Sequence, residues 1–167
     1  EAIEIFESLL EFLPDNHLCD IPIIQTDDEK ERETKIARET VPENAQAGYD
    51  MHDVLNDVFD LDSVLEIRPT YAPNMLTCFA LLNGRSVGII ANQPIARAGT
   101  IDIEASRKAA RFVSICDAYN IPIVTFVDTP GFEPGKDLEW RGMIRHGAEL
   151  VYAYAQASVP RLCLIIR

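Results

Sequence analysis

Residues 121–135 read IPIVTFVDTPGFEPG, an apolar run followed at once by a loop rich in proline and glycine. The run 121–127 is mostly β-branched and has its proline at the start, which is typical of a strand buried on both faces. The loop 128–135 holds two prolines and two glycines. Gly131 and Gly135 permit positive φ and a close approach of backbone to a ligand, so the loop is a candidate site. A rigid turn without a ligand is the alternative.

Helix and strand patterns alternate around this strand. A helix is expected over 103–119, begun by Asp102 and ended by Asn120 in a left-handed conformation, and another over 142–158. The apolar run 162–166 predicts a last buried strand. Strand, helix, strand, helix, strand at these lengths predicts a parallel sheet with crossover helices, and therefore an α/β fold.

A hairpin is expected before this unit. The segments 75–82 and 85–91 have strand character, and a shorter strand is expected at 64–68. Asn83-Gly84 is the strongest short hairpin signal, because both central positions of a type I′ turn need positive φ.

The first 66 residues differ from the rest in charge. They carry 19 Asp and Glu against 4 Lys and Arg, whereas residues 67–167 carry 8 against 11. The polar stretch 15–48 is expected to run over a surface. The helices expected in this part cover 2–13, a short piece near 29–38, and 51–59 with Asp50 as its N-cap. So sharp a split indicates two segments with different roles.

Composition excludes several classes of protein. The chain has 167 residues, 47% of them hydrophobic, and a net charge of −12, which argues against a basic nucleic-acid binder. No apolar run approaches the roughly 20 residues that span a bilayer. Four separated cysteines without a C-x-x-C pair speak against a metal or redox site and fit a reducing compartment. Cys78, Cys116 and Cys163 lie in apolar stretches and are expected in the core.

Few side chains offer chemistry of their own. Asp128-Thr-Pro-Gly131 is like the D-x-x-G element of nucleoside triphosphatases, but the phosphate-binding G-x-x-x-x-G-K-[ST] loop is missing. Arg141, Arg145 and His146 gather near a helix start, which suits an anion; a solvated helix face is the alternative. Trp140 could stack on a ligand or pack at an interface. No Ser-His-Asp or Cys-His arrangement can be argued, and the histidines are too scattered for a metal.

Longer motifs extend over most of the chain. They are Tyr71-Ala-Pro-Asn74, Leu82-Asn-Gly-Arg-Ser-Val-Gly88, Ala91-Asn-Gln-Pro94, Lys108-Ala-Ala-Arg-Phe-Val113, Cys116-Asp-Ala-Tyr-Asn-Ile-Pro122, Phe126-Val-Asp-Thr-Pro-Gly-Phe132 and Gly142-Met-Ile-Arg-His-Gly147. With them the stretch 71–167 resembles the carboxyltransferase β subunit of biotin-dependent acyl-CoA carboxylases, most closely the propionyl-CoA carboxylase group. Leu13-Pro-Asp-Asn16 and Tyr49-Asp-Met51 resemble the family's inter-domain segment, so the resemblance covers essentially the whole chain.

The resemblance implies a fold and a domain plan. The fold is the crotonase-like (ClpP/crotonase) ββα superhelix, duplicated within one subunit, and this chain resembles a partial second half. Residues 1–66 would be the acidic tail of the first half and the inter-domain connector, and residues 67–167 the front portion of the C-terminal carboxyltransferase domain. The first half resembles a site for acyl-CoA and the second a site for carboxybiotin. The 167 residues alone are expected to be inactive, and a catalytically inactive piece with only an assembly role is an alternative.

The resemblance also implies the chemistry. The carboxyl group of carboxybiotin moves to a short acyl-CoA, propionyl-CoA before acetyl-CoA, and backbone N–H groups stabilise the enolate charge, so no nucleophile is needed. Gly131 and Phe132 are expected to present a backbone oxyanion donor. The substrate-binding residues expected beside them are Gly99, Thr100, Pro134, Gly135 and Arg145. Glu133, Leu138 and the pair Gly99-Thr100 depart from the family's usual residues, which leaves the pocket detail and acyl substrate open.

Partners follow from the same resemblance. Biotin is expected on a partner carrier, together with a biotin carboxylase, an acyl-CoA and further copies of the same subunit. No metal, nucleic acid or membrane is expected, and the compartment is the cytoplasm, or the mitochondrial matrix in a eukaryote. A biotin-dependent decarboxylase or transcarboxylase, which reuses this subunit type, is the related alternative.

Overall fold

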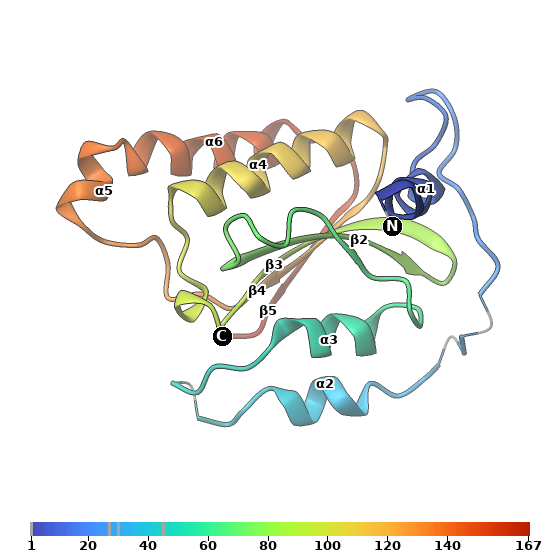
Figure 1. The fold of residues 1–167 in the computed structure, drawn as a ribbon, viewed down its shortest axis with the longest axis horizontal. Helices are drawn as coiled ribbons and strands as arrows, with labels where there is room; N and C mark the ends of the chain where they lie inside the picture. The colour runs from blue at the N-terminus through green and yellow to red at the C-terminus, as the bar shows by residue number, and fades with distance from the viewer. Residues whose placement is uncertain (1, 27, 30, 45) are drawn as a thin grey trace.

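A five-stranded mixed sheet lies between helices in the computed structural model of the chain, which describes residues 2–26, 28–29, 31–44 and 46–167 (Figure 1). The strands, which are neighbours in chain order, are β1 (Leu65–Glu66), β2 (Met75–Leu82), β3 (Arg85–Asn92), β4 (Ile123–Val127) and β5 (Arg161–Ile165). β1, β2 and β3 pair antiparallel, whereas β3, β4 and β5 pair parallel. The expected α/β fold is confirmed, with the hairpin and the parallel unit sharing β3.

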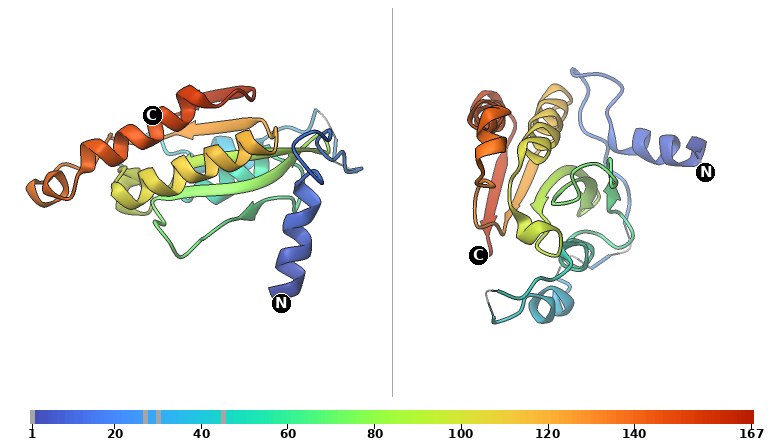
Figure 2. Two further views of the ribbon diagram at one scale, coloured as in Figure 1. Left: turned by 90° about the horizontal axis from the view of Figure 1, so that it is seen from above. Right: turned by 60° about the vertical axis from the view of Figure 1, so that its left-hand side comes forward.

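Helices cover both faces of this sheet. They are α1 (Ala2–Phe12), α2 (Lys35–Thr40), α3 (Met51–Val58), the 3-10 turn η1 (Arg97–Gly99), α4 (Ile103–Ala118), α5 (Lys136–Trp140) and α6 (Met143–Gln156). α4 and α6 lie on one face, and α2 and α3 lie on the other (Figure 1). α1 projects away from the body, as both views in Figure 2 show. Among the described residues, no helix combines the length and the apolarity that crossing a membrane requires.

Local signals in the sequence set several element ends. Asn83 and Gly84 have φ values of 51° and 74°, which confirms the expected hairpin turn. The Asp102 carboxylate accepts a hydrogen bond from Ala105 N at 2.7 Å and caps α4. The Asp50 carboxylate accepts one from His52 N at 2.9 Å and caps α3. Asn120, with φ of 59°, follows α4 in the left-handed conformation.

Two apolar clusters flank the sheet. On the α4 side, the rings of Phe79 and Phe112 lie 4.9 Å apart, and Phe12 of α1 stacks on Phe79 at 6.0 Å. On the α3 side, the buried Phe59 and Phe126 meet edge to face. Only the C-terminal end of α1 packs on the sheet, whereas its earlier apolar residues, such as Phe6, are exposed.

The expectation of a buried last strand is wrong. β5 is the edge of the sheet, and all five of its residues are exposed. Cys163 is therefore exposed rather than in the core, whereas Cys78 and Cys116 are buried as expected. Trp140 is 82% exposed, so the described residues do not cover it, and both alternatives for this side chain stay predictions. An apolar run indicates that both faces of a strand suit burial, but it does not say what covers them.

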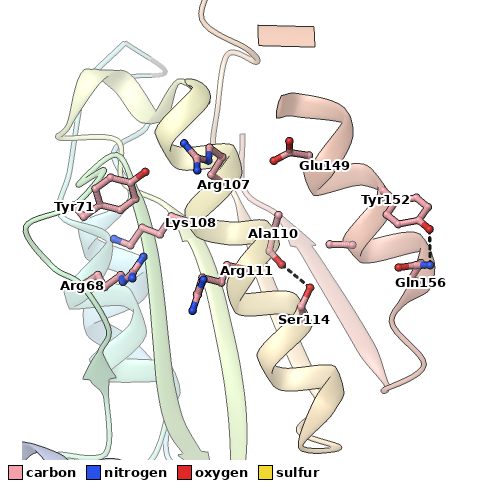
Figure 3. A pocket seen from close by; sticks show the side chains of 11 residues that line it. Arg68, Tyr71, Arg107, Lys108, Ala110, Arg111, Ser114, Glu149, Tyr152 and Gln156 are labelled. Atoms are coloured by element: carbon pink, nitrogen blue, oxygen red, sulfur yellow. Dashed lines mark hydrogen bonds between the residues drawn. The ribbon is translucent and has the colours of Figure 1, made fainter. Parts of the chain in front are cut away.

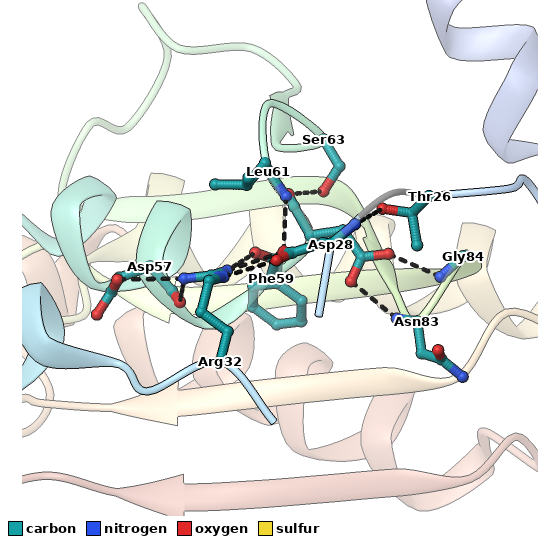
Figure 4. A network of polar contacts seen from close by, with 10 residues as sticks. Thr26, Asp28, Arg32, Asp57, Phe59, Leu61, Ser63, Asn83 and Gly84 are labelled. Carbon is teal, nitrogen blue, oxygen red and sulfur yellow. Dashed lines mark hydrogen bonds and ion pairs between the residues drawn. The ribbon is translucent and has the colours of Figure 1, made fainter. Parts of the chain in front are cut away.

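The acidic stretch before α3 is anchored to the sheet domain. The short helix expected near 29–38 is found at Lys35–Thr40, and residue 30 lies outside the described residues. Arg32 forms a bidentate pair with Asp28, at 2.8 and 3.0 Å, and donates to the backbone oxygens of Asp57 and Phe59 (Figure 4). These contacts fix the stretch against the end of α3, so it runs over the surface, as expected, in a defined position.

A carboxylate also holds the hairpin turn. Asp60, which follows α3, accepts hydrogen bonds from Asn83 N at 2.9 Å and Gly84 N at 2.7 Å (Figure 4). A side chain on Gly84 would place its Cβ 2.1 Å from the backbone oxygen of Ile24, so glycine is required by space as well as by φ.

Candidate active site

The loop 128–135 leaves the carboxyl end of β4 and is bound to the segment that precedes α4. Ile101 N donates to Gly131 O at 3.0 Å, and Glu133 N donates to Ile101 O at 3.0 Å. Ile101 and Phe132 thus form an isolated parallel bridge. In such a bridge the N–H of the paired residue, here Phe132, points away from its partner strand. Within the described residues, this N–H has no hydrogen-bond acceptor.

Gly131 shapes the loop rather than offering its own donor. Its N–H donates to Thr129 Oγ1 at 3.1 Å, and its φ of 120° lies outside the range of ordinary side-chain-bearing residues. A Cβ built on Gly131 would meet no atom within 4 Å, so this side of the loop is open. Of the two predicted donors, Phe132 N–H is the one left free for a ligand.

Gly99 occupies a space that a side chain cannot enter. It is buried with φ of 70°, and a Cβ there would lie 2.4 Å from Asp128 O. Asn92, the last residue of β3, joins the same two segments, because its Nδ2 donates to Gly99 O at 3.2 Å and its Oδ1 accepts from Asp128 N at 3.2 Å. Asn74 Nδ2 donates to Thr100 O at 2.7 Å. The structure therefore brings the predicted Gly99, Thr100 and Gly131 together beyond the carboxyl ends of β3 and β4.

Asp128 is an anchor beneath the loop. Its buried carboxylate accepts a hydrogen bond from Tyr49 Oη at 2.7 Å and pairs with Arg167 Nε at 2.9 Å. The Arg167 guanidinium also lies 5.2 Å from the centre of the Tyr49 ring. Burial raises the pKa of Tyr49, with the Asp128 hydrogen bond acting in the same direction, so the phenol stays a donor. These contacts satisfy Asp128, which favours a structural role over acid–base chemistry.

Arg97 links the loop to the start of α4. Its guanidinium contacts Asp102 Oδ2 at 2.6 Å and Glu133 Oε1 at 2.8 Å. The second oxygen of Glu133 is buried and has no hydrogen-bond partner among the described residues. Glu133, a departure from the family's usual residue, thus has a defined partner here.

An apolar cavity of about 360 Å³ opens beside the loop. The residues that line it include Phe132, Glu133, Pro134, Glu139, Met143, Ile144, Gly147, Ala148 and Val151. A Cβ on Gly147 would lie 3.0 Å from the Phe132 ring, so glycine at this place in α6 allows the ring to lie against the helix. The predicted Phe132 and Pro134 therefore form one wall of a ligand-sized hollow.

Other predicted residues lie apart from this cavity. Gly135 is exposed at the start of α5. Arg145 is exposed and does not line the cavity itself, but it lines an open hollow on α6 that adjoins it, since Ala148 and Val151 line both. Arg141 pairs with Glu104 at 2.7 Å, and His146 contacts Glu149 at 3.2 Å. The structure therefore does not assemble these side chains into an anion-binding cluster. The roles of Gly135 and Arg145 stay predictions.

The polar residues that hold the loop could not be identified from the sequence. Asn74, Asn92 and Arg97 come from three separate segments, and their contacts with the 97–102 turn and the loop exist only in the folded chain. The available signal was position, since Asn92 ends one parallel strand and Asp128 directly follows the next. In the described part of the chain, no three His, Cys, Asp or Glu side chains gather in a way that could hold a metal ion.

The fold and the loop define a class of protein, the carboxyltransferases of crotonase-like fold. The chain superposes on transcarboxylase 12S, a hexamer with hydrolysed methylmalonyl-coenzyme A bound, with a TM-score of 0.95 and 44% identity, over 99% of this chain and 32% of that one. It also superposes on a single-chain, multi-domain long-chain acyl-CoA carboxylase with a TM-score of 0.87 and 30% identity, over 99% of this chain and 16% of that one.

The sequence matches the model of the carboxyl transferase domain over residues 1–167, and the chain belongs to that family. It is 50% identical to methylmalonyl-CoA decarboxylase subunit alpha of Veillonella parvula, over 100% of this chain and 33% of that protein. It is 48% identical to the propionyl-CoA carboxylase carboxyltransferase subunit of Haloferax mediterranei, over 100% of this chain and 32% of that protein. The chain therefore spans about a third of the length of these relatives.

Proposed function

We propose that the protein containing this chain is the carboxyltransferase component of a biotin-dependent enzyme that acts on a short-chain acyl-CoA. The observation that carries the proposal is the family match over all 167 residues. The relatives support it, because each name describes carboxyl transfer to or from an acyl-CoA. Propionyl-CoA is the favoured acceptor and acetyl-CoA the next.

The residues beside the loop 128–135 fit a biotin group carried in by a partner. Biotin combines a ureido carbonyl, which accepts hydrogen bonds, with an apolar body. The unpartnered Phe132 N–H matches the first feature, and the apolar cavity along Phe132, Pro134 and α6 matches the second. When bound, biotin supplies the carboxyl group to be transferred.

The chain's own residues then have the following tasks. Phe132 N–H donates a hydrogen bond to the developing oxyanion, where one preorganised donor is worth about 10²–10³ in rate. Gly131 sets the direction of that N–H through its positive φ. Asn92 joins the loop to the 97–102 turn through its bonds with Asp128 N and Gly99 O, and Gly99 lies directly against Asp128 O. Thr100 is held beside them by the hydrogen bond from Asn74 Nδ2 to its backbone oxygen. Pro134 excludes water from the cavity wall, while Gly135 and Arg145 would contact substrate only if further parts of the assembly close over them.

The direction of the reaction distinguishes two candidate functions. The 48% identity to a propionyl-CoA carboxylase subunit favours carboxylation. The 50% identity to a methylmalonyl-CoA decarboxylase subunit favours the reverse use of the same site. Both readings place the same transfer step at the loop, and they differ in the partner that loads or empties the biotin.

The test uses the full-length protein with a biotin carrier, a biotin carboxylase, ATP and labelled bicarbonate. We expect most label in the carboxylated product of propionyl-CoA, less in that of acetyl-CoA and least in those of longer acyl-CoAs. Incubation with methylmalonyl-CoA and unloaded carrier, without ATP, measures the reverse direction. Failure to label any short acyl-CoA, together with no loss of carboxyl group from methylmalonyl-CoA, would reject the proposal.

The domain plan and the partners belong to the same proposal. Residues 1–66 would serve as first-half tail and connector, and residues 67–167 as the front of the carboxyltransferase domain. Exposed apolar side chains on α6 and β5 support cover by further protein, either other parts of the full-length protein or another copy of it, because such surfaces are rarely left open. The four free cysteines support the cytoplasm, or the mitochondrial matrix in a eukaryote. Light scattering on the full-length protein tests the oligomer directly.

A further inference from the structure

A second cavity, of about 450 Å³, lies on the α4 face of the sheet and is strongly basic. The connection between β1 and β2, α4 and α6 form its walls. Four cations line it, and Figure 3 shows the side chains of Arg68, Lys108 and Arg111 gathered between that connection and α4, with Arg107 near them. The cavity shares no lining residue with the apolar cavity beside the loop.

The charges of this cavity are poorly compensated. Among the described residues, Arg68, Arg107 and Arg111 form no ion pair with a carboxylate, and Arg68 lies 5.8 Å from the centre of the Tyr71 ring. Glu149 is the one acidic residue that lines the cavity, and it contacts His146 on its own helix.

Lys108 forms the inner wall and is tightly held. Its side chain is only 1% exposed, with Nζ 3.4 Å from Ala72 O and 3.7 Å from Glu66 Oε1. Glu66 lies behind the lysine and also contacts His52 at 2.9 Å, so its charge is shared between two cations. Holding four cations around one hollow is unfavourable unless an anion neutralises them.

We propose that this cavity binds the phosphate groups of a small phosphorylated ligand, such as a nucleoside diphosphate. Arginine guanidinium groups bind phosphate through paired, charge-assisted hydrogen bonds, and three of them line this cavity together with a lysine. The volume is in the range of small-molecule sites. A single carboxylate would satisfy fewer of these donors than a diphosphate. The proposal does not depend on which carboxyl transfer the protein performs.

The ligand's phosphates have two possible sources, a free nucleotide or the nucleotide portion of coenzyme A. The experiment measures binding of inorganic pyrophosphate, ADP and coenzyme A to the full-length protein by calorimetry at low and moderate salt.

The test variant is the double substitution Arg107→Gln and Arg111→Gln, whose side chains are exposed and whose loss leaves the core intact. The matched control is Arg38→Gln, which removes one exposed positive charge from α2 on the other face of the sheet.

We expect pyrophosphate and ADP to bind the parent protein, with affinity falling as salt rises, and the double variant to bind at least tenfold more weakly. Arg38→Gln should retain the parent affinity. If coenzyme A loses affinity in step with ADP, the acyl-CoA nucleotide is the source; if it does not, a separate nucleotide is. No binding of pyrophosphate or ADP to the parent, or equal binding to parent and double variant, would overturn the proposal. Carboxyl transfer measured on the same samples is a separate readout.

Discussion

Gly99 is the residue where backbone and space constrain the candidate site most tightly. Its φ is 70°, and a Cβ would lie 2.4 Å from Asp128 O, which is backbone and cannot turn aside. Gly99→Ala should therefore push the η1 turn away from the end of β4. We expect a loss of about 2–3 kcal/mol in stability, seen as a lower melting temperature of the full-length protein, with a fall in carboxyl transfer.

A neighbouring residue provides the control for this substitution. Ala98 also has positive φ, at 53°, so Ala98→Gly relieves strain instead of adding it. Its melting temperature should equal or exceed that of the parent. If Gly99→Ala and Ala98→Gly melt alike, the close contact with Asp128 does not constrain the turn.

Gly131 should behave differently, because the space beside it is open. Gly131→Val meets no atom within 4 Å at Cβ but forces a φ of 120° on a β-branched residue. The loop should relax and turn the Phe132 N–H away from its ligand. We expect turnover to fall at least tenfold while the melting temperature drops by only a few degrees. Lys136→Ala, on exposed α5, should change neither quantity, and equal turnover in Gly131→Val would remove the loop from the site.

His52 links stability to pH. It contacts Asp50 at 2.7 Å and Glu66 at 2.9 Å, and the Glu66 hydrogen bond, with help from Asp50, raises its pKa from 6.5 to about 9 against the effect of burial. A raised histidine pKa stabilises the fold fully below pH 6.5, and this contribution disappears as pH rises through 9.

The expected size is about 1 kcal/mol, because solvent screens a side chain that is 36% exposed. Melting temperatures of the full-length protein from pH 6 to 10 should fall more steeply in the parent than in His52→Gln. His17→Gln, in the exposed stretch after α1, should retain the parent slope. Parallel curves for parent and His52→Gln would contradict the assignment.

At the scale of elements, Arg32 decides whether the acidic stretch stays on the domain. Arg32→Gln removes the pair with Asp28 and the contacts with Asp57 O and Phe59 O (Figure 4). We expect limited proteolysis of the full-length protein to cut residues 20–40 several times faster. Lys35→Gln, which removes only the exposed pair with Glu33, should be cut at the parent rate. Equal cleavage rates for both variants would show that the Arg32 contacts are not needed to hold the acidic stretch on the domain.

Elements whose ends depend on local chemistry could be predicted from the sequence. The Asn83-Gly84 turn, the Asp102 cap and the Asn120 stop each act within a few residues, so β2, β3 and α4 lie close to their expected positions. Exposure could not be predicted in this way. The apolar run of β5 suits burial, but the neighbour that would cover it is a matter of tertiary arrangement.

The candidate site could be predicted only in part, because the sequence shows local chemistry but not contacts between distant segments. The composition of the loop 128–135 identified the strand end that carries it. The residues that position it, such as Asn92 and Arg97, contact partners up to 36 positions away, so no spacing in the sequence reveals them. The proposal of Phe132 rather than Gly131 as the donor also needed the bridge to Ile101.

At the scale of the molecule, the uneven charge of the sequence acquires a spatial meaning. The acidic first 66 residues include the stretch that Arg32 fastens on the α3 side of the sheet, whereas Arg68, Arg107 and Arg111 of the basic cavity lie on the opposite, α4 side. Between these faces, the carboxyl ends of β3 and β4 carry the loop. The net charge of −12 is therefore a sum over surfaces of opposite sign and does not describe the ligand.

The most direct test of this account is a single-turnover transfer. Full-length protein is mixed with a purified biotin carrier that already bears a labelled carboxyl group, and with propionyl-CoA, in the absence of ATP. We predict that label moves from the carrier to the acyl-CoA, and that Gly131→Val slows this movement at least tenfold. Label that stays on the carrier, or leaves it only as free bicarbonate while the protein remains folded, would contradict it.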